Sequence, residues 1–208
     1  MPRDQQALAR LIARHGVAQW IIAAFHAIDR ADFVPARSRG LAYSDRPVGL
    51  PHGQTTSQPS LIARMLDELA VPDGGKILEV GTGYGFQTAL LAQRAARVVS
   101  IERHEELARA AGENLSRAGV DNVSVIVGDG WRGVPEEAPF DGIVVSAAAS
   151  ELPADLASQL SEQSRIIIPI QELGGDAVYA FVKVEGRVER LSMVTPARFV
   201  PLVPGSES

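Results

Sequence analysis

The chain of 208 residues contains no cysteine, and this absence removes several kinds of chemistry at once. Disulfide frameworks, thiolate metal sites, iron–sulfur clusters and cysteine nucleophiles are all excluded. The four histidines fall in helical or loop contexts without the spacing of metal ligands, so we expect no bound metal. A chain without cysteine also suits a reducing compartment, and we expect a cytoplasmic protein.

Positive charge and long apolar runs are also scarce. The chain carries 20 Lys and Arg against 25 Asp and Glu, a net charge of −5, whereas a nucleic-acid binder usually shows a basic footprint. Apolar runs such as 166–168 and 178–182 are far shorter than the ~20 residues of a membrane-spanning helix. We therefore expect a monomeric globular protein that binds neither nucleic acid nor membrane.

Prolines and glycines gather in one early segment. Residues 4–30 have helical periodicity with a break at Gly16, but residues 33–59 contain four prolines and three glycines, which exclude long regular elements. That segment keeps apolar anchors, including Tyr43 and Leu50. A long irregular loop with anchors in a compact domain is typically functional.

A regular alternation follows Pro59. Apolar strands are expected at 76–80, 97–101, 123–127, 143–145 and 165–168. A helix is expected before the first strand, at 60–69, and further helices between strands, at 87–94, 105–117 and 154–160. Segments 177–184 and 187–193 alternate around the turn Glu185-Gly186, which indicates an antiparallel hairpin. The pattern predicts an α/β fold: a doubly wound, mostly parallel sheet closed by an antiparallel hairpin and preceded by N-terminal helices.

A glycine loop, GTGYG at 81–85, lies between a predicted strand and a predicted helix. Gly81 permits a tight turn and Gly83 lets a ligand approach the backbone. The spacing differs from the G-x-G-x-x-G of dinucleotide sites, and no Gly-Lys-Ser/Thr follows to cradle a phosphate. The first difference disfavours a dehydrogenase, and the second disfavours a nucleoside triphosphatase.

Two acidic residues follow the next two strands. Glu102 is placed to accept hydrogen bonds from the ribose hydroxyls of an adenosine, and Asp129 to receive the adenine amino group. Each has an ordinary alternative, because Glu102 could be a helix N-terminal acid and Asp129 could begin a turn. Together with the glycine loop they favour a ligand with adenosine but no diphosphate, which fits S-adenosylmethionine.

The sequence at this point resembles the protein-L-isoaspartate O-methyltransferase family, which consists of S-adenosylmethionine-dependent class I methyltransferases with a Rossmann-like fold. The most specific part is GQTTSQP at 53–59, while the glycine loop is shared by many methyltransferases. The resemblance covers nearly the whole chain, through segments 33–35, 42–47, 53–59, 78–89, 100–102, 128–130, 138–141, 146–148 and 198–202.

The resemblance implies methyl transfer from S-adenosylmethionine to the free carboxylate of isoaspartyl residues in damaged proteins or peptides. It implies one domain over 1–208, with helices and the substrate loop in 1–58 and the cofactor core in 59–203. By the same resemblance Ser57 is the catalytic residue and the substrate-binding residues are Thr55, Thr56, Tyr43 and Asp45. The implied cofactor-binding residues are Glu79, Gly81, Thr82, Gly83, Gly85, Glu102, Arg103, Asp129 and Gly130.

Several of these side chains have structural alternatives. Ser57 stands where it could cap the helix expected from residue 60, Asp45 could bond its own backbone in a turn, and Tyr43 could anchor the loop. The resemblance favours the catalytic interpretation of Ser57.

Other functions remain open. An enzyme of the same fold and cofactor could methylate another peptide carboxylate, and a binding module could hold the cofactor or a peptide without turnover. A nucleic-acid methyltransferase is disfavoured by the net charge and by Ser146-Ala-Ala-Ala149, where an Asn-Pro-Pro-aromatic motif would stand.

Overall fold

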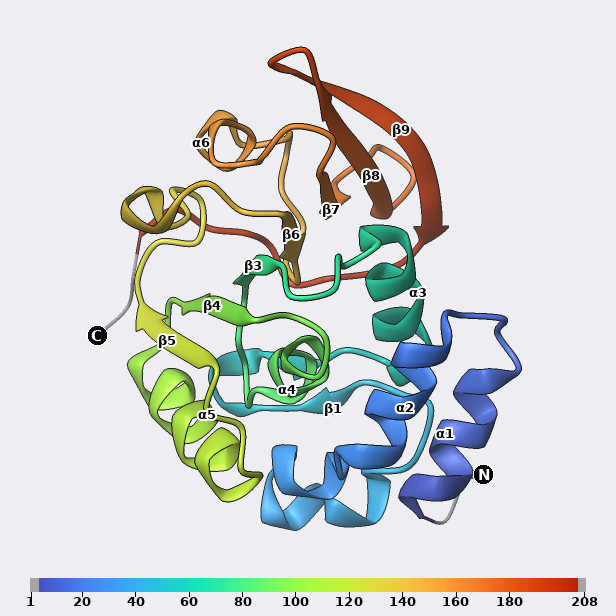
Figure 1. Ribbon diagram of the computed structural model, residues 1–208. Coiled ribbons are helices and arrows are strands. Elements are labelled where there is room, and N and C mark those ends of the chain that lie inside the picture. The colour runs from blue at the N-terminus through green and yellow to red at the C-terminus, as the bar shows by residue number, and fades with distance from the viewer. Residues whose placement is uncertain (1–3, 206–208) are drawn as a thin grey trace.

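A seven-stranded sheet organises the molecule in the computed structural model, which describes residues 4–205 (Figure 1). The strand order is β5-β4-β3-β6-β7-β8-β9. Strands β3 to β7 are parallel to one another, and β8 pairs antiparallel with both β7 and β9. The strands are β3 (Lys76–Val80), β4 (Arg97–Glu102), β5 (Val123–Val127), β6 (Gly142–Val145), β7 (Arg165–Ile170), β8 (Ala177–Val184) and β9 (Arg187–Pro196). The predicted doubly wound sheet with its antiparallel hairpin is confirmed.

Two apolar clusters cover the two faces of this sheet. Side chains alternate along each central strand, so Ile77 and Val98 join one cluster while Leu78 and Val99 join the other. The first cluster includes buried residues of the helices α1 (Gln5–Ala13), α2 (Gln19–Ala27), α3 (Pro59–Leu69), α4 (Phe86–Ala92) and α5 (Glu105–Arg117). The second contains α6 (Ala154–Ser158), which lies across the sheet from α3 and α4 in Figure 1. Strands buried on both faces explain the uninterrupted apolar runs in the sequence.

The irregular segment contains two short strands that the sequence did not predict. Strands β1 (Val48–Gly49) and β2 (Thr55–Thr56) pair antiparallel, and the 3-10 helices Arg30–Phe33, Ala36–Leu41 and Pro51–Gly53 lie before and between them along the chain. Each strand has only two residues, too few to produce a visible alternation. Strand β2 lies within the GQTTSQP motif.

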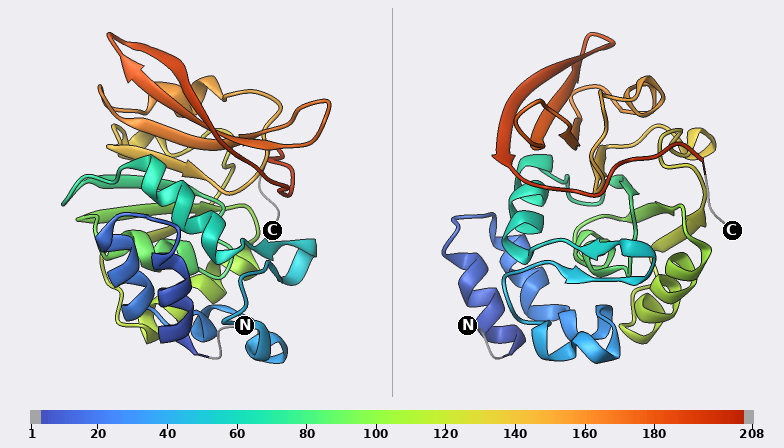
Figure 2. Two further views of the ribbon diagram at one scale, coloured as in Figure 1. Left: turned by 90° about the vertical axis from the view of Figure 1, so that its right-hand side faces the viewer. Right: turned by 180° about the vertical axis from the view of Figure 1, so that it is seen from behind.

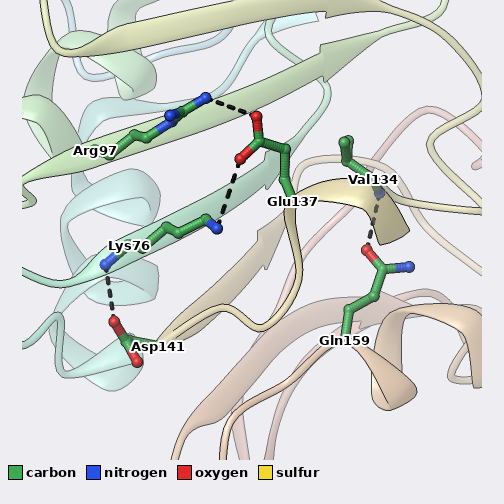
Figure 3. A network of polar contacts seen from close by, with 6 residues as sticks. All are labelled: Lys76, Arg97, Val134, Glu137, Asp141 and Gln159. Atoms are coloured by element: carbon green, nitrogen blue, oxygen red, sulfur yellow. Dashed lines mark hydrogen bonds and ion pairs between the residues drawn. The ribbon is translucent and has the colours of Figure 1, made fainter.

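A polar network holds the amino ends of β3 and β4 (Figure 3). The Glu137 carboxylate lies 2.6 Å from Nη2 of Arg97 and 3.6 Å from Nζ of Lys76, and Asp141 Oδ2 accepts the Lys76 N–H at 2.9 Å. Gln159 Oε1 accepts the N–H of Val134 at 2.8 Å. These contacts fix the crossover from β5 to β6 at the edge opposite the glycine loop.

The chain after β9 returns across the carboxyl edge of the sheet. The N–H of Ala148 donates to the carbonyl of Val200 at 2.8 Å, and the N–H of Leu202 donates to the carbonyl of Ala148 at 2.7 Å. This segment and the β1–β2 ribbon lie on the same side of the molecule (Figure 2). They form two walls over the ends of β3, β4 and β6.

Candidate active site

A cleft opens at the carboxyl edge of the sheet. It lies where the strand order reverses, because β3 is flanked by β4 on one side and by β6 on the other. Open α/β sheets bind ligands at this switch point. The lining residues come from all the surrounding elements: Gln54, Thr55, Val80, Gly81, Gly83, Ile101, Glu102, Arg103, Leu107, Gly130, Ser146, Ala147, Val200, Pro201, Leu202 and Val203.

Two glycines of the loop need their lack of a side chain. Gly81 has φ 94° and Gly83 has φ 56°, both in the left-handed region that L side chains avoid. A Cβ on Gly81 would lie 3.4 Å from Cβ of Ser146, and both glycines line the cleft. Gly85 differs, because it precedes α4 and a Cβ there would lie 3.3 Å from Leu115. Gly85 is thus required for packing of α5, away from the cleft.

The carboxylate of Glu102 is fixed by backbone donors at the cleft wall. Its Oε2 accepts the N–H of Gly83 at 2.9 Å and its Oε1 accepts the N–H of His104 at 3.1 Å. The side chain is buried yet lines the cleft. Since each carboxylate oxygen has two lone pairs, each can accept one further hydrogen bond from a ligand hydroxyl.

The other expected cofactor residues divide into two groups. Arg103 and Gly130 line the cleft. Asp129 is not among the lining residues; its Oδ1 accepts the N–H of Trp131 at 2.9 Å, the turn contact given as its alternative. Thr82 is buried and its Oγ1 lies 2.6 Å from Oγ of Ser100, although it lines a smaller neighbouring cavity.

Glu79 lies fully buried beneath the loop and does not reach the cleft. Its Oε2 accepts hydrogen bonds from the hydroxyls of Thr88 and Ser100, and its Oε1 accepts one from Nε2 of Gln87 at 3.0 Å. Burial raises the pKa of Glu79 to about 7, although these hydrogen bonds favour the ionised form and oppose that shift. Glu79 therefore links β3 to α4 and to β4.

A second hollow, a groove, lies beside the cleft and shares Thr55, Ser146 and Val200 with it. Thr55 and Ser146 line the cleft, the groove and the smaller cavity between them, while Ser57 lines the groove and the smaller cavity. The groove is also lined by His15, Pro47, Gln58, Ser60, Leu61, Arg64, Thr195, Pro196, Ala197, Arg198, Phe199 and Val200. Hydroxyl groups thus gather where the two larger hollows meet.

The helix-capping interpretation of Ser57 is wrong. Helix α3 has Gln58 at its N-cap with no side-chain cap of its own. Asp45 supplies the cap from a distant segment: its Oδ1 accepts the N–H of Ser60 and its Oδ2 accepts the Ser60 hydroxyl, each at 2.9 Å. Oδ2 also accepts Nε2 of Gln58 at 2.9 Å. The structure leaves Ser57 facing the groove and makes Asp45 a structural residue.

The side chains of two further residues expected to bind substrate form hydrogen bonds within the protein. The Tyr43 hydroxyl donates to the carboxylate of Asp29 and lies 3.1 and 3.2 Å from its two oxygens. Burial is the largest cause that raises the pKa of Tyr43, and this hydrogen bond is the second. Tyr43 does not line any of the hollows described above. Its contact with Asp29 agrees with the structural interpretation, in which Tyr43 anchors the loop. Thr56 lines the smaller cavity, but its Oγ1 accepts a hydrogen bond from Arg30 at 2.8 Å.

Sequence reasoning missed Arg30, which is fully buried and organises the active-site loop. Its guanidinium donates to the carbonyls of Ala42, Ser44, Arg46 and Ser57 at 3.0–3.1 Å, besides Thr56. Burial lowers its pKa to about 10, and the charge of Asp45 opposes that change. Arg30 stands in the charged stretch Asp29-Arg-Ala-Asp32, and in a sequence such a stretch is typical of an exposed segment.

Within residues 4–205, no cluster of three or more His, Asp or Glu side chains is arranged to hold a metal ion. No helix in that range combines the length and apolar character needed to cross a bilayer.

Comparisons with known proteins agree over nearly the whole chain. A family model described as protein-L-isoaspartate(D-aspartate) O-methyltransferase matches residues 3–207. A Methanoculleus marisnigri protein named protein-L-isoaspartate O-methyltransferase is 42% identical over 201 residues, which are 97% of this chain and 91% of that protein.

Two solved structures share the fold closely. One, named protein-L-isoaspartate O-methyltransferase, superposes with a TM-score of 0.87 at 29% identity, over 95% of this chain and 65% of that chain. The other is a Plasmodium falciparum protein in complex with S-adenosyl-L-homocysteine, with a TM-score of 0.85 at 28% identity over 97% of this chain and 99% of its own.

Proposed function

This chain belongs to the protein-L-isoaspartate O-methyltransferase family, and from that membership we propose how its own residues perform the reaction. The enzyme methylates the free carboxylate of isoaspartyl residues in damaged proteins and uses S-adenosylmethionine as methyl donor. One observation carries the assignment of residues: a cleft suited to adenosine and a groove open to solvent meet at a cluster of hydroxyl groups.

The cleft is assigned to S-adenosylmethionine. Glu102 would accept hydrogen bonds from the ribose hydroxyls, since its two oxygens are already oriented by backbone N–H groups at 2.9 and 3.1 Å. Gly81 and Gly83 leave room above the loop, and Ile101 and Leu202 supply apolar walls. When bound, S-adenosylmethionine supplies an activated methyl group on a sulfonium. Arg103 and Gly130 complete this proposed binding site, with Glu79, Thr82 and Gly85 supporting the loop from below.

The groove is assigned to the isoaspartyl acceptor, with Ser57 as the residue that contacts its carboxylate. A carboxylate with an ordinary pKa near 4 is already ionised at neutral pH, so the enzyme needs no general base. A serine hydroxyl can donate a hydrogen bond to that anion and orient it. Thr55, beside it on β2, lines both hollows and is proposed as a second contact.

Orientation is the main contribution expected from the protein. The acceptor oxygen must approach the methyl carbon to about 3 Å in line with the bond that breaks. The opposite charges of carboxylate and sulfonium neutralise each other during transfer, so strong attraction in the ground state would not by itself accelerate the reaction. Hydroxyl donors suit this chemistry because they align the carboxylate without a positive charge. A positive charge would stabilise the ionised carboxylate more than the transition state, in which the carboxylate is losing its negative charge.

We also propose that the enzyme is a cytoplasmic monomer, that it does not act on nucleic acid, and that 1–208 is one domain. In this proposal 1–58 positions the acceptor and 59–203 the cofactor. The net charge of −5 supports the exclusion of nucleic acid.

The decisive experiment uses two synthetic peptides that differ only in an isoaspartyl or a normal aspartyl linkage. Incorporation of labelled methyl from S-adenosylmethionine is expected with the isoaspartyl peptide alone. Equal methylation of both peptides would indicate an enzyme for another carboxylate. Calorimetric binding of S-adenosylmethionine without transfer to either peptide would indicate a binding module.

A further inference from the structure

Ser146, the residue that follows β6, lies at the junction of the three hollows. It shares with Thr55 the property of lining the cleft, the groove and the smaller cavity. Its backbone is fixed, because its N–H donates to the carbonyl of Val80 at 2.9 Å. It lies against the first glycine of the loop, Gly81, at the switch point of the sheet.

The hydroxyl of Ser146 is oriented by a buried side chain. Nε2 of Gln87 lies 3.0 Å from Oε1 of Glu79 and 3.0 Å from Oγ of Ser146. In this arrangement the amide nitrogen of Gln87 faces both groups and donates to Oε1 of Glu79. The amide nitrogen has two hydrogens and no acceptor capacity, so its second hydrogen goes to Ser146.

This arrangement determines what Ser146 can still do. Its Oγ accepts from Gln87, so its own hydrogen cannot point back along that contact. Within residues 4–205 the Ser146 hydroxyl has no other protein partner. The remaining O–H donor is therefore available to a ligand in the hollows that Ser146 lines.

We propose that Ser146 is an acceptor-binding residue, whose hydroxyl donates a hydrogen bond to the isoaspartyl carboxylate and is held for that purpose by the Glu79–Gln87 pair. This inference rests on the assignment of the groove to the acceptor. Donors on opposite walls of the junction, Ser57 on the irregular loop and Ser146 after β6, would then orient one carboxylate. Glu79 acts as a positioning residue through Gln87, because it is fully buried and lines none of the three hollows.

The test compares peptide affinity in the presence of S-adenosylhomocysteine, so that no transfer occurs. Ser146→Ala should weaken binding of the isoaspartyl peptide about tenfold, the scale for losing a hydrogen bond to a charged group. The same substitution should weaken much less the binding of a peptide whose isoaspartyl carboxylate is already a methyl ester, because a neutral ester accepts a weaker hydrogen bond than a carboxylate. Ser146→Thr keeps the hydroxyl and should restore binding. Ser150→Ala, at an exposed serine of the same loop, is the matched control.

The outcomes separate this inference from the function it rests on. Equal weakening of both peptides would indicate a structural role for Ser146, and unchanged binding of both would also overturn the proposal. Either result can occur in an enzyme that still methylates the isoaspartyl peptide. Failure of the parent protein to methylate that peptide would instead overturn the proposed function.

Discussion

Nη2 of Arg30 donates a hydrogen bond to Oγ1 of Thr56 at 2.8 Å, which links a fully buried arginine to the residue beside Ser57. The same nitrogen also donates to the carbonyl of Ser57 at 3.1 Å. Both terminal nitrogens of this guanidinium donate to groups of the irregular loop, while its buried Nε has no hydrogen-bond partner among the described residues. The loop thus keeps a defined shape although it contains only four strand residues.

Arg30→Met should destabilise the protein strongly. The substitution removes the donor for four carbonyls and one hydroxyl, and leaving a buried acceptor unsatisfied costs about 1–3 kcal/mol for each group that water does not reach. Urea unfolding measures the free energy of unfolding directly. Arg39→Met is the control, since that arginine is exposed on the same segment and should change stability by less than about 0.5 kcal/mol. Similar losses in both variants would show that Arg30 does not organise the loop.

Ser57→Ala and Asp45→Ala should separate function from structure. Ser57→Ala should lower turnover of an isoaspartyl peptide about tenfold or more with S-adenosylmethionine affinity nearly intact, since it removes a donor to a charged group. Asp45→Ala removes the cap of α3 and should cost about 1–2 kcal/mol of stability, measured by urea unfolding. The assignment fails if Ser57→Ala destabilises the fold while its turnover matches that of the parent.

Glu102→Ala should weaken the binding of S-adenosylmethionine. Leaving two ribose hydroxyls without their acceptor is expected to cost about 1–3 kcal/mol, which calorimetry reads as a change in Kd. Glu105→Ala provides the control, because Glu105 is exposed in the first turn of α5 and is absent from the cleft lining. If Glu102 were only a helix N-terminal acid, both variants would lose a little stability and neither would lose cofactor affinity.

The sequence predicted the elements whose periodicity extends over several residues. The strand at 76–80 and the helix at 105–117 were predicted with the observed bounds, because burial on both faces or on one helical face leaves a visible pattern. The two-residue strands β1 and β2 leave no such pattern, and their pairing depends on contacts distant in sequence.

The sequence predicted the location of site residues whose place in the fold follows from their backbone position. Gly81, Gly83 and Glu102 follow parallel strands and therefore meet at one edge of the sheet. Asp45 was expected to bind substrate, but whether a carboxylate faces a groove or a helix end depends on tertiary placement. Arg30 and Gln87 were missed for the same reason, since their partners lie up to 59 residues away in sequence.

The stability of the protein should carry a pH dependence from Glu79. Burial raises the pKa of this carboxyl to about 7 in the folded state, from about 4.5 when it is exposed. Between these values the folded state binds more protons than the unfolded state, so the contribution of Glu79 to stability is complete below about pH 4.5 and is lost as the pH rises through about 7. The loss is on the order of 3 kcal/mol.

Other groups titrate in the same range, so the prediction concerns the difference between the parent and Glu79→Gln, which does not ionise at this position. From about pH 5 to about pH 8, the free energy of unfolding of the parent should fall relative to that of the variant, measured by urea unfolding at each pH. Parallel curves would show that Glu79 has an ordinary pKa. A difference that grows in favour of the parent as the pH rises would mean that hydrogen bonds from Thr88, Ser100 and Gln87 outweigh burial and hold the carboxylate ionised.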